Sequence, residues 1–225
     1  MEKATQNEKY SLYPIFVDLH NRRIVVIGGG DVAERKVKTL LAHGAKVTVI
    51  APEATEEINE LASSGAIELE RRPYEPGDLA GAAIAFSACG IPEVDDDVLA
   101  EAHERNCLVN VVDVRDKCDF YVPSLVERGP LSIAVSTQGT SPSTARDLRK
   151  RFEREFDTSW GAYLNLMGGF RALVQERISG PASARRPYYD AASLADWRDR
   201  LAKGESLTAE EAFEEVRETL GGEDR

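Results

Sequence analysis

The sequence feature that most constrains the fold is a short apolar run that leads directly into a glycine-rich turn. Residues 24–27 read Ile-Val-Val-Ile, and three glycines follow at once. A continuous apolar run is typical of a strand that is buried on both faces of a parallel sheet. Apolar residues at helical spacing come next, and Gly44 suits the end of that helix. The pattern therefore predicts a strand, a tight turn and a helix in immediate succession.

The same alternation continues to residue 112. Short apolar or β-branched runs predict strands, and the longer segments between them predict helices. Strands that alternate with helices of about ten residues need parallel crossover connections. The sequence therefore predicts an α/β fold with a Rossmann-type doubly wound parallel sheet over residues 12–122. Its later strands are expected at 47–50, 67–69, 84–86 and 108–112, with helices around 56–62 and 94–105.

Beyond residue 112 the pattern changes. Two strand-like stretches, residues 120–125 and 131–136, flank a predicted turn. This pair either extends the parallel sheet or forms a separate hairpin. The rest of the chain predicts a helix capped by Ser141 with Pro142 first, a linker at 180–187, and a last helix opened by a capping box of Thr208 and Glu211.

The glycine-rich turn fits the dinucleotide-binding pattern G-x-G-x-x-G/A, with Gly28, Gly30 and Ala33 at the three fixed positions. That pattern needs a tight turn at the first position, close approach of the backbone to a pyrophosphate at the second, and a small residue for helix packing at the third. The first turn of the helix then offers free N–H groups and a partial positive charge to the phosphates. A glycine-rich turn without a ligand is the alternative.

An acidic residue that binds the adenosine ribose is expected about 20 residues after the glycines, but Ile50 and Ala51 stand there. Glu53 is the nearest carboxylate. It either serves the ribose from a slightly later position or lies at the start of the next helix, where the helix dipole favours an acid. Because residues 51–55 contain no Arg or Lys, nothing there matches the 2′-phosphate of NADP, and NAD is the expected cofactor.

Asp113 follows the last strand of the alternating region. Ligands of open α/β sheets bind outside the carboxyl ends of the strands, so we expect Asp113 to lie in the same crevice as Gly28. A carboxylate there can take a proton from a substrate while a hydride leaves for a nicotinamide. Aspartate is also common at strand ends because it stabilises turns, and spacing alone does not decide between these roles.

Composition excludes several classes of function. The net charge of −11 argues against a protein that binds nucleic acid irrespective of its sequence, since such proteins present a basic face. No apolar run approaches the roughly 20 residues of a membrane-spanning helix, and residues 1–10 lack the apolar core of a signal peptide. We therefore expect a cytoplasmic protein with no membrane partner.

The thiols and imidazoles show no pattern that predicts a metal site. Cys89, Cys107 and Cys118 are odd in number and form no CxxC motif, so we expect reduced structural thiols. The three histidines are scattered without ligand spacing. No metal ligated by protein side chains alone is expected.

Several separated motifs, taken together, resemble precorrin-2 dehydrogenase, the enzyme of siroheme synthesis that occurs alone or as the N-terminal half of siroheme synthases. They follow one another in the order of the family, and the resemblance extends from Leu12 to Ile178. The motifs are residues 13–16 with Leu19, residues 26–36, residues 110–113, residues 120–123 with 130–131, and residues 139–142.

The resemblance implies NAD-dependent oxidation of precorrin-2 to sirohydrochlorin, and some family members also insert ferrous iron. The catalytic aspartate of the family falls on Asp113. The dinucleotide contacts of the family fall on Asp31 and Val32 in the glycine-rich loop and on Pro52 and Glu53 after the second strand.

The resemblance also implies how the chain is divided and assembled. Family members are homodimers, in which residues 123–150 would form much of the interface and residues 151–225 a small helical domain. No methyltransferase domain is expected, so another protein would methylate the substrate.

Two positions depart from the family pattern. After the fourth strand the family often has Ala-Thr-Asn or Ala-Thr-Asp, whereas residues 87–90 read Ser-Ala-Cys-Gly, so the contact of Ala88 with the cofactor is expected to differ. Thr137 stands where a second serine is common. Neither change removes a group on which the dehydrogenation depends.

A cluster of cations follows the Ser/Thr/Gly loop of residues 136–141. Precorrin-2 carries many carboxylates, and the forked guanidinium of arginine suits carboxylates. The alternative is that these cations form the solvated face of a helix. The cations are Arg146, Arg149, Lys150, Arg151 and Arg154, and the expected substrate contacts are Ser136, Thr140, Ser141, Arg146 and Arg149.

Three functions remain open from the sequence. They are a dehydrogenase that uses Asp113 as a general base or to orient the substrate, the same enzyme with added ferrochelatase activity, and a non-catalytic module that binds a dinucleotide and reports redox state. A sensor needs no carboxylate beside the nicotinamide, so Asp113 and the resemblance favour an enzyme. The acid excess does not oppose a polycarboxylate substrate, because residues 205–225 hold eight acids and only two bases.

Overall fold

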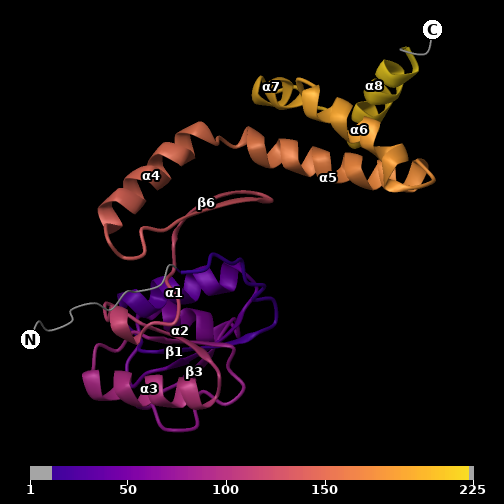
Figure 1. The fold of residues 1–225 in the computed structure, drawn as a ribbon. Helices are drawn as coiled ribbons and strands as arrows, with labels where there is room; N and C mark the ends of the chain where they lie inside the picture. Colours follow the sequence, from indigo (N-terminus) through magenta and orange to yellow (C-terminus); the bar gives the residue numbers. More distant parts are fainter. Residues whose placement is uncertain (1–11, 223–225) are drawn as a thin grey trace, which may run out of the picture. The chain divides into compact units, whose positions relative to one another are not determined.

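The computed structural model describes residues 12–222. The expectation about a signal peptide concerns residues 1–10, which lie outside the described residues, as do the last three residues of the expected helical domain. The described chain forms two compact units, residues 12–122 and residues 123–222 (Figure 1). Each unit has a hydrophobic core of its own.

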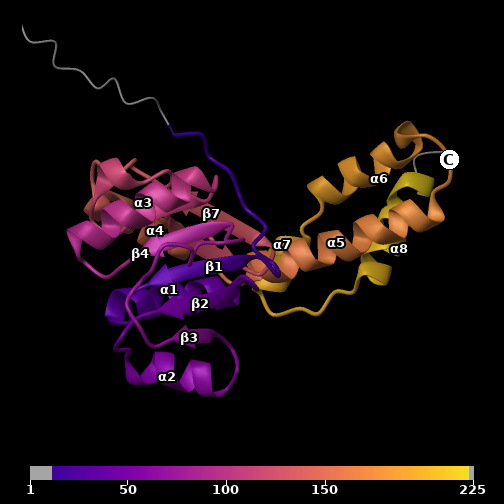
Figure 2. The ribbon, with the colours of Figure 1, turned by 90° about the horizontal axis from the view of Figure 1, so that it is seen from below.

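The first unit contains a five-stranded parallel sheet in the order β3-β2-β1-β4-β5. Figure 2 shows β4, β1, β2 and β3 laid out in this order. The strand order reverses between β1 and β4, which makes that place the topological switch point of a doubly wound sheet. The predicted Rossmann-type fold is therefore confirmed. The strands are β1 (Arg23–Ile27), β2 (Lys46–Ile50), β3 (Glu68–Glu70), β4 (Ile84–Ser87) and β5 (Leu108–Val111).

Helices cover both faces of this sheet, which explains why its strands read as continuous apolar runs. Val37 of α1 and Ile58 of α2 are buried in one core layer, together with Val26 of β1. Val98 of α3 is buried in a second layer with Val25, the neighbour of Val26 that points to the opposite face. In Figure 1, α1 lies above the sheet and α3 below it. The helices are α1 (Asp31–Ala42), α2 (Glu56–Ser63) and α3 (Pro92–Glu104).

The second unit begins with a hairpin that is separate from the parallel sheet. Strands β6 (Ser124–Arg128) and β7 (Leu131–Val135) pair only with each other, in antiparallel register. Gly129 in the turn has a φ of +58°, which a side chain would disfavour. Helix α4 (Pro142–Glu155) follows, and the side chain of Ser141 caps it by accepting from the main-chain nitrogen of Thr144 at 3.3 Å. The predicted cap is confirmed.

Four further helices complete the second unit, namely α5 (Ser159–Arg177), α6 (Ala182–Leu194), α7 (Trp197–Ala202) and α8 (Ala209–Gly222). Their core is aromatic, because the ring of Phe170 lies 5.3 Å from that of Trp197 and 6.4 Å from that of Phe213. The predicted capping box opens α8. The main-chain nitrogen of Thr208 donates to the Glu211 carboxylate at 2.8 Å, and the nitrogen of Glu211 donates to the Thr208 hydroxyl at 3.3 Å.

The predicted linker at residues 180–187 is wrong, because α6 starts at Ala182 and continues through Pro187. A proline inside a helix removes one hydrogen bond and costs about 3 kcal/mol. Tertiary packing offsets this cost, since the ring of Tyr188 stacks on that of Phe213 at 5.6 Å and Ala192 is fully buried. Pro187 does disfavour a helix locally, but packing against residues distant in the sequence outweighs this effect.

Candidate active site

The carboxyl ends of four strands lie level with one another in the first unit. In the ladder, Ile27 of β1 pairs with Ile50 of β2 and with Ser87 of β4, and Ser87 pairs with Val111 of β5. The residues that follow these four positions must therefore leave the sheet along one edge. Every residue that the sequence predicts to bind the cofactor, and Asp113, lies on this edge or in the first turn of α1.

Gly28 makes the turn from β1 into the loop. Its φ is +115°, and a Cβ atom there would lie 2.6 Å from the main-chain oxygen of Ala88. The nitrogen of Gly28 donates to the oxygen of Ile50 at 2.9 Å, and the nitrogen of Ala88 donates to the oxygen of Ile27 at 2.7 Å. The loop is therefore fixed between the ends of β2 and β4, where only a residue without a side chain fits.

Gly29 was not singled out from the sequence, yet it is the most crowded of these glycines. A Cβ atom at this position would lie 2.1 Å from the main-chain oxygen of Glu53 and 2.9 Å from the Cα atom of Ala54. The oxygen of Gly29 also accepts from the nitrogen of Thr55 at 2.9 Å. Gly29 thus joins the loop to the segment after β2.

Within the described part of the chain, no neighbouring atom requires residue 30 to be a glycine. Its backbone is extended, with φ −85° and ψ −175°, and a Cβ atom would meet no described atom within 4 Å. A side chain here would occupy open space in front of the first turn of α1. This is the space into which the dinucleotide pattern places a pyrophosphate, and the residues present therefore fit a bound dinucleotide.

The first turn of α1 provides the other groups of the loop. Asp31 is exposed and Val32 is half-buried, whereas Ala33 is fully buried against the sheet. Ala33 packs in the same core layer as Val26, which requires a small side chain where helix and strand approach closely. Gly30 is the N-cap of α1 and no side chain caps this turn, so the first N–H groups, which point toward the helix N-terminus, have no side-chain acceptor there.

The segment after β2 exposes Pro52 and Glu53. Helix α2 begins at Glu56 with Thr55 as its N-cap, and its first-turn acids are Glu56 and Glu57. Glu53 therefore lies before the cap, so the interpretation of Glu53 as a first-turn acid of that helix does not hold. Its carboxylate stays exposed on the same edge as the glycine loop.

The end of β4 presents Ala88 beside the loop, with a polar anchor beneath it. The hydroxyl of Ser87 donates to the buried carboxylate of Asp95 at 2.5 Å, which ties the strand end to α3. Ala88 and Cys89 are both half-buried. Ala88 contributes main-chain groups and a methyl group to this edge, and no polar side chain.

Asp113 occupies a β-turn at the end of β5. The nitrogen of Val114 donates to the oxygen of Val111 at 3.2 Å, and Asp113, the third residue of this turn, has a φ of +63°. A positive φ at this position normally requires glycine or asparagine. Asp113 is exposed, and glycine would adopt this conformation at lower cost, so the retained carboxylate is a candidate for a functional group.

Lys36 of α1, which was not expected from the sequence to belong to the site, lies near the same edge. Its ammonium nitrogen lies 5.4 Å from the ring centre of Phe86 in β4. Burial lowers the pKa of Lys36 from its ordinary value and Arg35 lowers it further, while the nearby Cys118 and Asp113 raise it. The sequence shows only that Lys36 precedes an apolar residue of the helix, Val37, and this does not predict that Lys36 lies near Asp113.

The five residues expected to bind the substrate belong to the second unit, in the loop after β7 and in the first turns of α4. Ser136 accepts from the nitrogen of Gln138 at 3.1 Å, and Ser141 caps α4, so each hydroxyl oxygen accepts one hydrogen bond from the main chain of its own segment. Thr140 and Arg146 are exposed. Arg149 donates to the carboxylate of Glu153, one turn further along the helix. Arg149 thus forms an ion pair with Glu153, whereas Arg146 does not.

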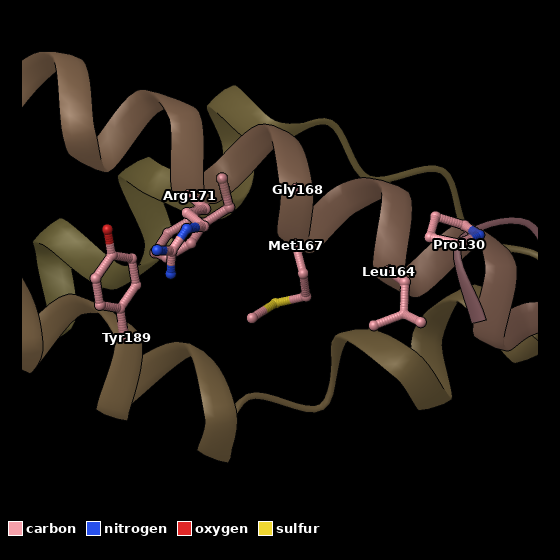
Figure 3. Close-up of a pocket in the computed structure, with 7 residues that line it drawn as sticks. Pro130, Leu164, Met167, Gly168, Arg171 and Tyr189 are labelled. Carbon is pink, nitrogen blue, oxygen red and sulfur yellow. The ribbon is translucent and has the colours of Figure 1, made fainter. Parts of the chain in front are cut away.

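The second unit also contains a pocket of about 440 Å³. In Figure 3, Leu164 and Met167 of α5 point into it, with Pro130 at one end and Arg171 and Tyr189 at the other. The guanidinium of Arg171 lies over the ring of Tyr189, 5.5 Å from its centre. None of the predicted site residues lines this pocket, so it forms no part of the candidate active site.

Two further observations concern the described residues as a whole. No helix within residues 12–222 is long and apolar enough to cross a membrane. The same residues contain no group of three or more His, Cys, Asp or Glu side chains arranged to hold a metal ion. Cys89, Cys107 and Cys118 are thiols and not disulfides.

Two family models match this chain. The first, described as putative NAD(P)-binding, matches residues 15–124. The second, described as sirohaem biosynthesis protein central, matches residues 128–155. The first match contains the glycine loop and Asp113, and it supports a nicotinamide dinucleotide as the cofactor of the first unit.

Curated relatives and solved structures agree with these matches. The siroheme synthase of Pseudoalteromonas translucida is 34% identical over 203 residues, covering 90% of this chain and 43% of the relative. The siroheme synthase of Chromobacterium violaceum is 36% identical over 215 residues, covering 95% of this chain and 45% of the relative. The chain thus spans less than half the length of these relatives. The structure of SirC, precorrin-2 dehydrogenase, is 26% identical with a TM-score of 0.76, covering 92% of this chain and all of SirC.

Proposed function

This chain belongs to the family of SirC and the siroheme synthases, and we propose that it oxidises precorrin-2 to sirohydrochlorin with NAD⁺ as the electron acceptor. The observation that carries the proposal is the placement of two groups on one edge of the sheet. The glycine loop leaves β1 at Gly28, and Asp113 leaves β5 at a strand end that is level with it. A dinucleotide site and an exposed carboxylate at a topological switch point are what a dehydrogenase of this fold needs.

The first turn of α1 and the open space at Gly30 would hold the pyrophosphate of the dinucleotide. Gly28, Gly30, Asp31, Val32 and Ala33 form that part of the site, and Ala88 borders it from the end of β4. The bound nicotinamide supplies a hydride acceptor. The side chains themselves bind, orient and move protons.

NAD⁺ is the dinucleotide that the segment after β2 favours. Pro52 and Glu53 are exposed there, and residues 51–55 include no cation. A carboxylate at Glu53 can accept hydrogen bonds from a ribose diol, and it repels the 2′-phosphate of NADP⁺. The comparisons support a nicotinamide dinucleotide, and the preference for NAD⁺ rests on Glu53.

The oxidation removes two hydrogens from precorrin-2, one as a hydride and one as a proton. In our proposal the ionised carboxylate of Asp113 accepts the proton while the hydride leaves, so charge and electrons balance with one NADH formed per sirohydrochlorin. The turn from Val111 to Val114 fixes the position from which the carboxylate acts. Ser136, Thr140, Ser141, Arg146 and Arg149 would bind the carboxylates of the substrate.

We further propose that the protein acts in the cytoplasm as a homodimer. Residues 123–150 would supply much of the dimer interface, and residues 151–225 would form the helical domain that follows. Helix α4 continues from Pro142 to Glu155 across residue 150, so these two parts would share that helix.

An anaerobic assay of the purified protein tests this proposal. Precorrin-2 and NAD⁺ are added first, and absorption spectra follow both sirohydrochlorin and NADH. The expected result is equal amounts of the two products, with NADP⁺ a weaker acceptor. Tight binding of NAD⁺ without turnover would contradict the proposal and favour a redox sensor. Ferrous iron added afterwards tests for chelatase activity in the same sample.

A further inference from the structure

The turn that carries Asp113 is held from below by the thiol of Cys118. The sulfur lies 3.1 Å from the main-chain oxygen of Val111 and 3.3 Å from that of Val114. These two residues are the first and the last of the β-turn, and they flank Asp113. The thiol is thus within donor distance of both carbonyl groups that define the turn.

Neighbouring contacts hold the sulfur in this place. The side-chain nitrogen of Asn110, in β5, donates to the sulfur at 3.5 Å and to the oxygen of Phe120 at 2.9 Å. A short 3-10 helix, Arg115–Lys117, brings the chain back beneath the turn so that Cys118 faces it. Cys118 therefore connects the strand end, the turn and the returning segment.

The turn needs such support because its conformation is unfavourable for aspartate. A residue other than glycine with a φ near +60° costs about 1 kcal/mol or more, and Asp113 has a φ of +63°. The only main-chain hydrogen bond that closes the turn, among described residues, is the 3.2 Å bond between Val114 and Val111. A donor that engages the carbonyl groups at both ends of the turn opposes its opening.

We propose that Cys118 is a positioning residue for the dehydrogenation, because its thiol holds the turn that aims the Asp113 carboxylate. This inference rests on the proposed function, in which Asp113 accepts the substrate proton. The thiol touches neither substrate nor cofactor in this proposal. It acts through the main chain, and a hydroxyl group in its place can perform the same task.

The test compares Cys118→Ala with Cys118→Ser, which keeps a donor at nearly the same place. Amide hydrogen exchange of Val114, read by NMR, reports the opening of the turn without any need for turnover. Losing a net hydrogen bond is expected to raise this exchange rate about three- to tenfold in Cys118→Ala. Cys118→Ser should bring the rate back toward that of the wild type.

Kinetics form the second readout. Misplacement of the proton acceptor should lower kcat about tenfold or more in Cys118→Ala while KM for NAD⁺ stays unchanged, and serine should restore kcat. Cys107→Ala is the matched control, because Cys107 is a buried thiol whose sulfur lies 3.7 Å from the oxygen of Leu108. This control should leave the exchange of Val114 and kcat close to those of the wild type.

These measurements distinguish failure of the role of Cys118 from failure of the proposed function. Unchanged exchange of Val114 in Cys118→Ala overturns it, whether or not the protein oxidises precorrin-2. Faster exchange with an unchanged kcat in an active enzyme also overturns it. A third outcome is faster exchange of Val114 in a protein that shows no oxidation at all. It would mean that Cys118 supports the turn, but it would refute the proposed function and, with it, the positioning role.

Discussion

The main-chain oxygen of Glu53 lies only 2.1 Å from the place where a Cβ atom of residue 29 would be. The next residue is different, since a Cβ atom at Gly30 would meet no described atom within 4 Å and its φ of −85° suits any residue. Two adjacent glycines therefore exist for separate reasons. Gly29 lets the loop fold against the segment after β2, and Gly30 leaves open space in front of α1, where we propose that the pyrophosphate binds.

We predict that Gly30→Val abolishes NAD⁺ binding without unfolding the protein, because the valine side chain fills the space meant for the pyrophosphate. Isothermal titration calorimetry should show at least a hundredfold loss of affinity, about 2.7 kcal/mol. The thermal midpoint should stay within a few degrees of the wild type. Gly29→Val is the contrast, and it should lower the midpoint strongly. Unchanged affinity in Gly30→Val would refute the loop as the dinucleotide site.

Glu101 is predicted to make folding of the first unit sensitive to acid. It is a buried carboxylate in α3 that accepts from the hydroxyl of Tyr74, from the nitrogens of Gly77 and Leu79 at 2.9 and 3.2 Å, and from Arg105. Burial alone raises the pKa of Glu101, but these donors together hold it below its ordinary value. A carboxyl whose pKa is lowered by folding stabilises the fold above its unfolded pKa of about 4.3. That stabilisation is lost as the pH falls through the folded value.

Glu101→Gln tests this prediction by removing the charge at nearly constant size. At pH 7 the variant should lose about 1 to 3 kcal/mol of unfolding free energy, because buried donors lose a charged acceptor. The difference between variant and wild type should shrink as the pH falls below about 4.3, because the unfolded wild type then binds a proton at Glu101 that the folded protein takes up only at lower pH. Urea titrations at several pH values measure both quantities. A difference that does not depend on pH would contradict the prediction.

The exposed cations of α4 are predicted to set the affinity for the substrate. Arg146 and Lys150 are exposed and lie one turn apart on the same face of the helix, whereas Arg149 is paired with Glu153. The double change Arg146→Gln and Lys150→Gln should raise KM for precorrin-2 about tenfold and leave kcat unchanged, because it removes only carboxylate recognition.

A control for net charge is available at the end of α7 and on α8. Lys203→Gln with Arg217→Gln removes the same two charges at exposed positions outside α4. Steady-state kinetics at low and high salt should show the effect only for the α4 pair, and that effect should shrink as salt rises. Equal effects of both pairs would mean that overall charge matters and not a site on α4.

The sequence was sufficient for the parts of the fold that depend on local pattern. The apolar run of β1, the glycines after it and the alternation of strands and helices predicted the doubly wound sheet, and Ser141 and Thr208 predicted two helix starts. Each of these signals lies within a few residues of the structure that it produces. The helix through Pro187 was missed because packing against Phe213, distant in sequence, decides it.

Features of the site that depend on contacts between residues distant in the sequence could not be predicted from the sequence either. Nothing in the three glycines shows that Gly29 faces Glu53, because that contact needs β1 and β2 to be paired. The positive φ of Asp113 and the thiol below it follow from the way the chain returns after β5. The pairing of Arg149 with Glu153, in contrast, has the helical spacing of four residues and could have been read from the sequence.

Oxidation of precorrin-2 by Asp113→Asn is the most direct test of the account. Asparagine is common at positive φ and has nearly the same size, so the turn and the binding of NAD⁺ should be kept while the proton acceptor is lost. We predict that anaerobic NADH formation falls by at least a hundredfold, with an unchanged dissociation constant for NAD⁺. Oxidation at the wild-type rate by this variant would contradict the assignment of Asp113 and the mechanism built on it.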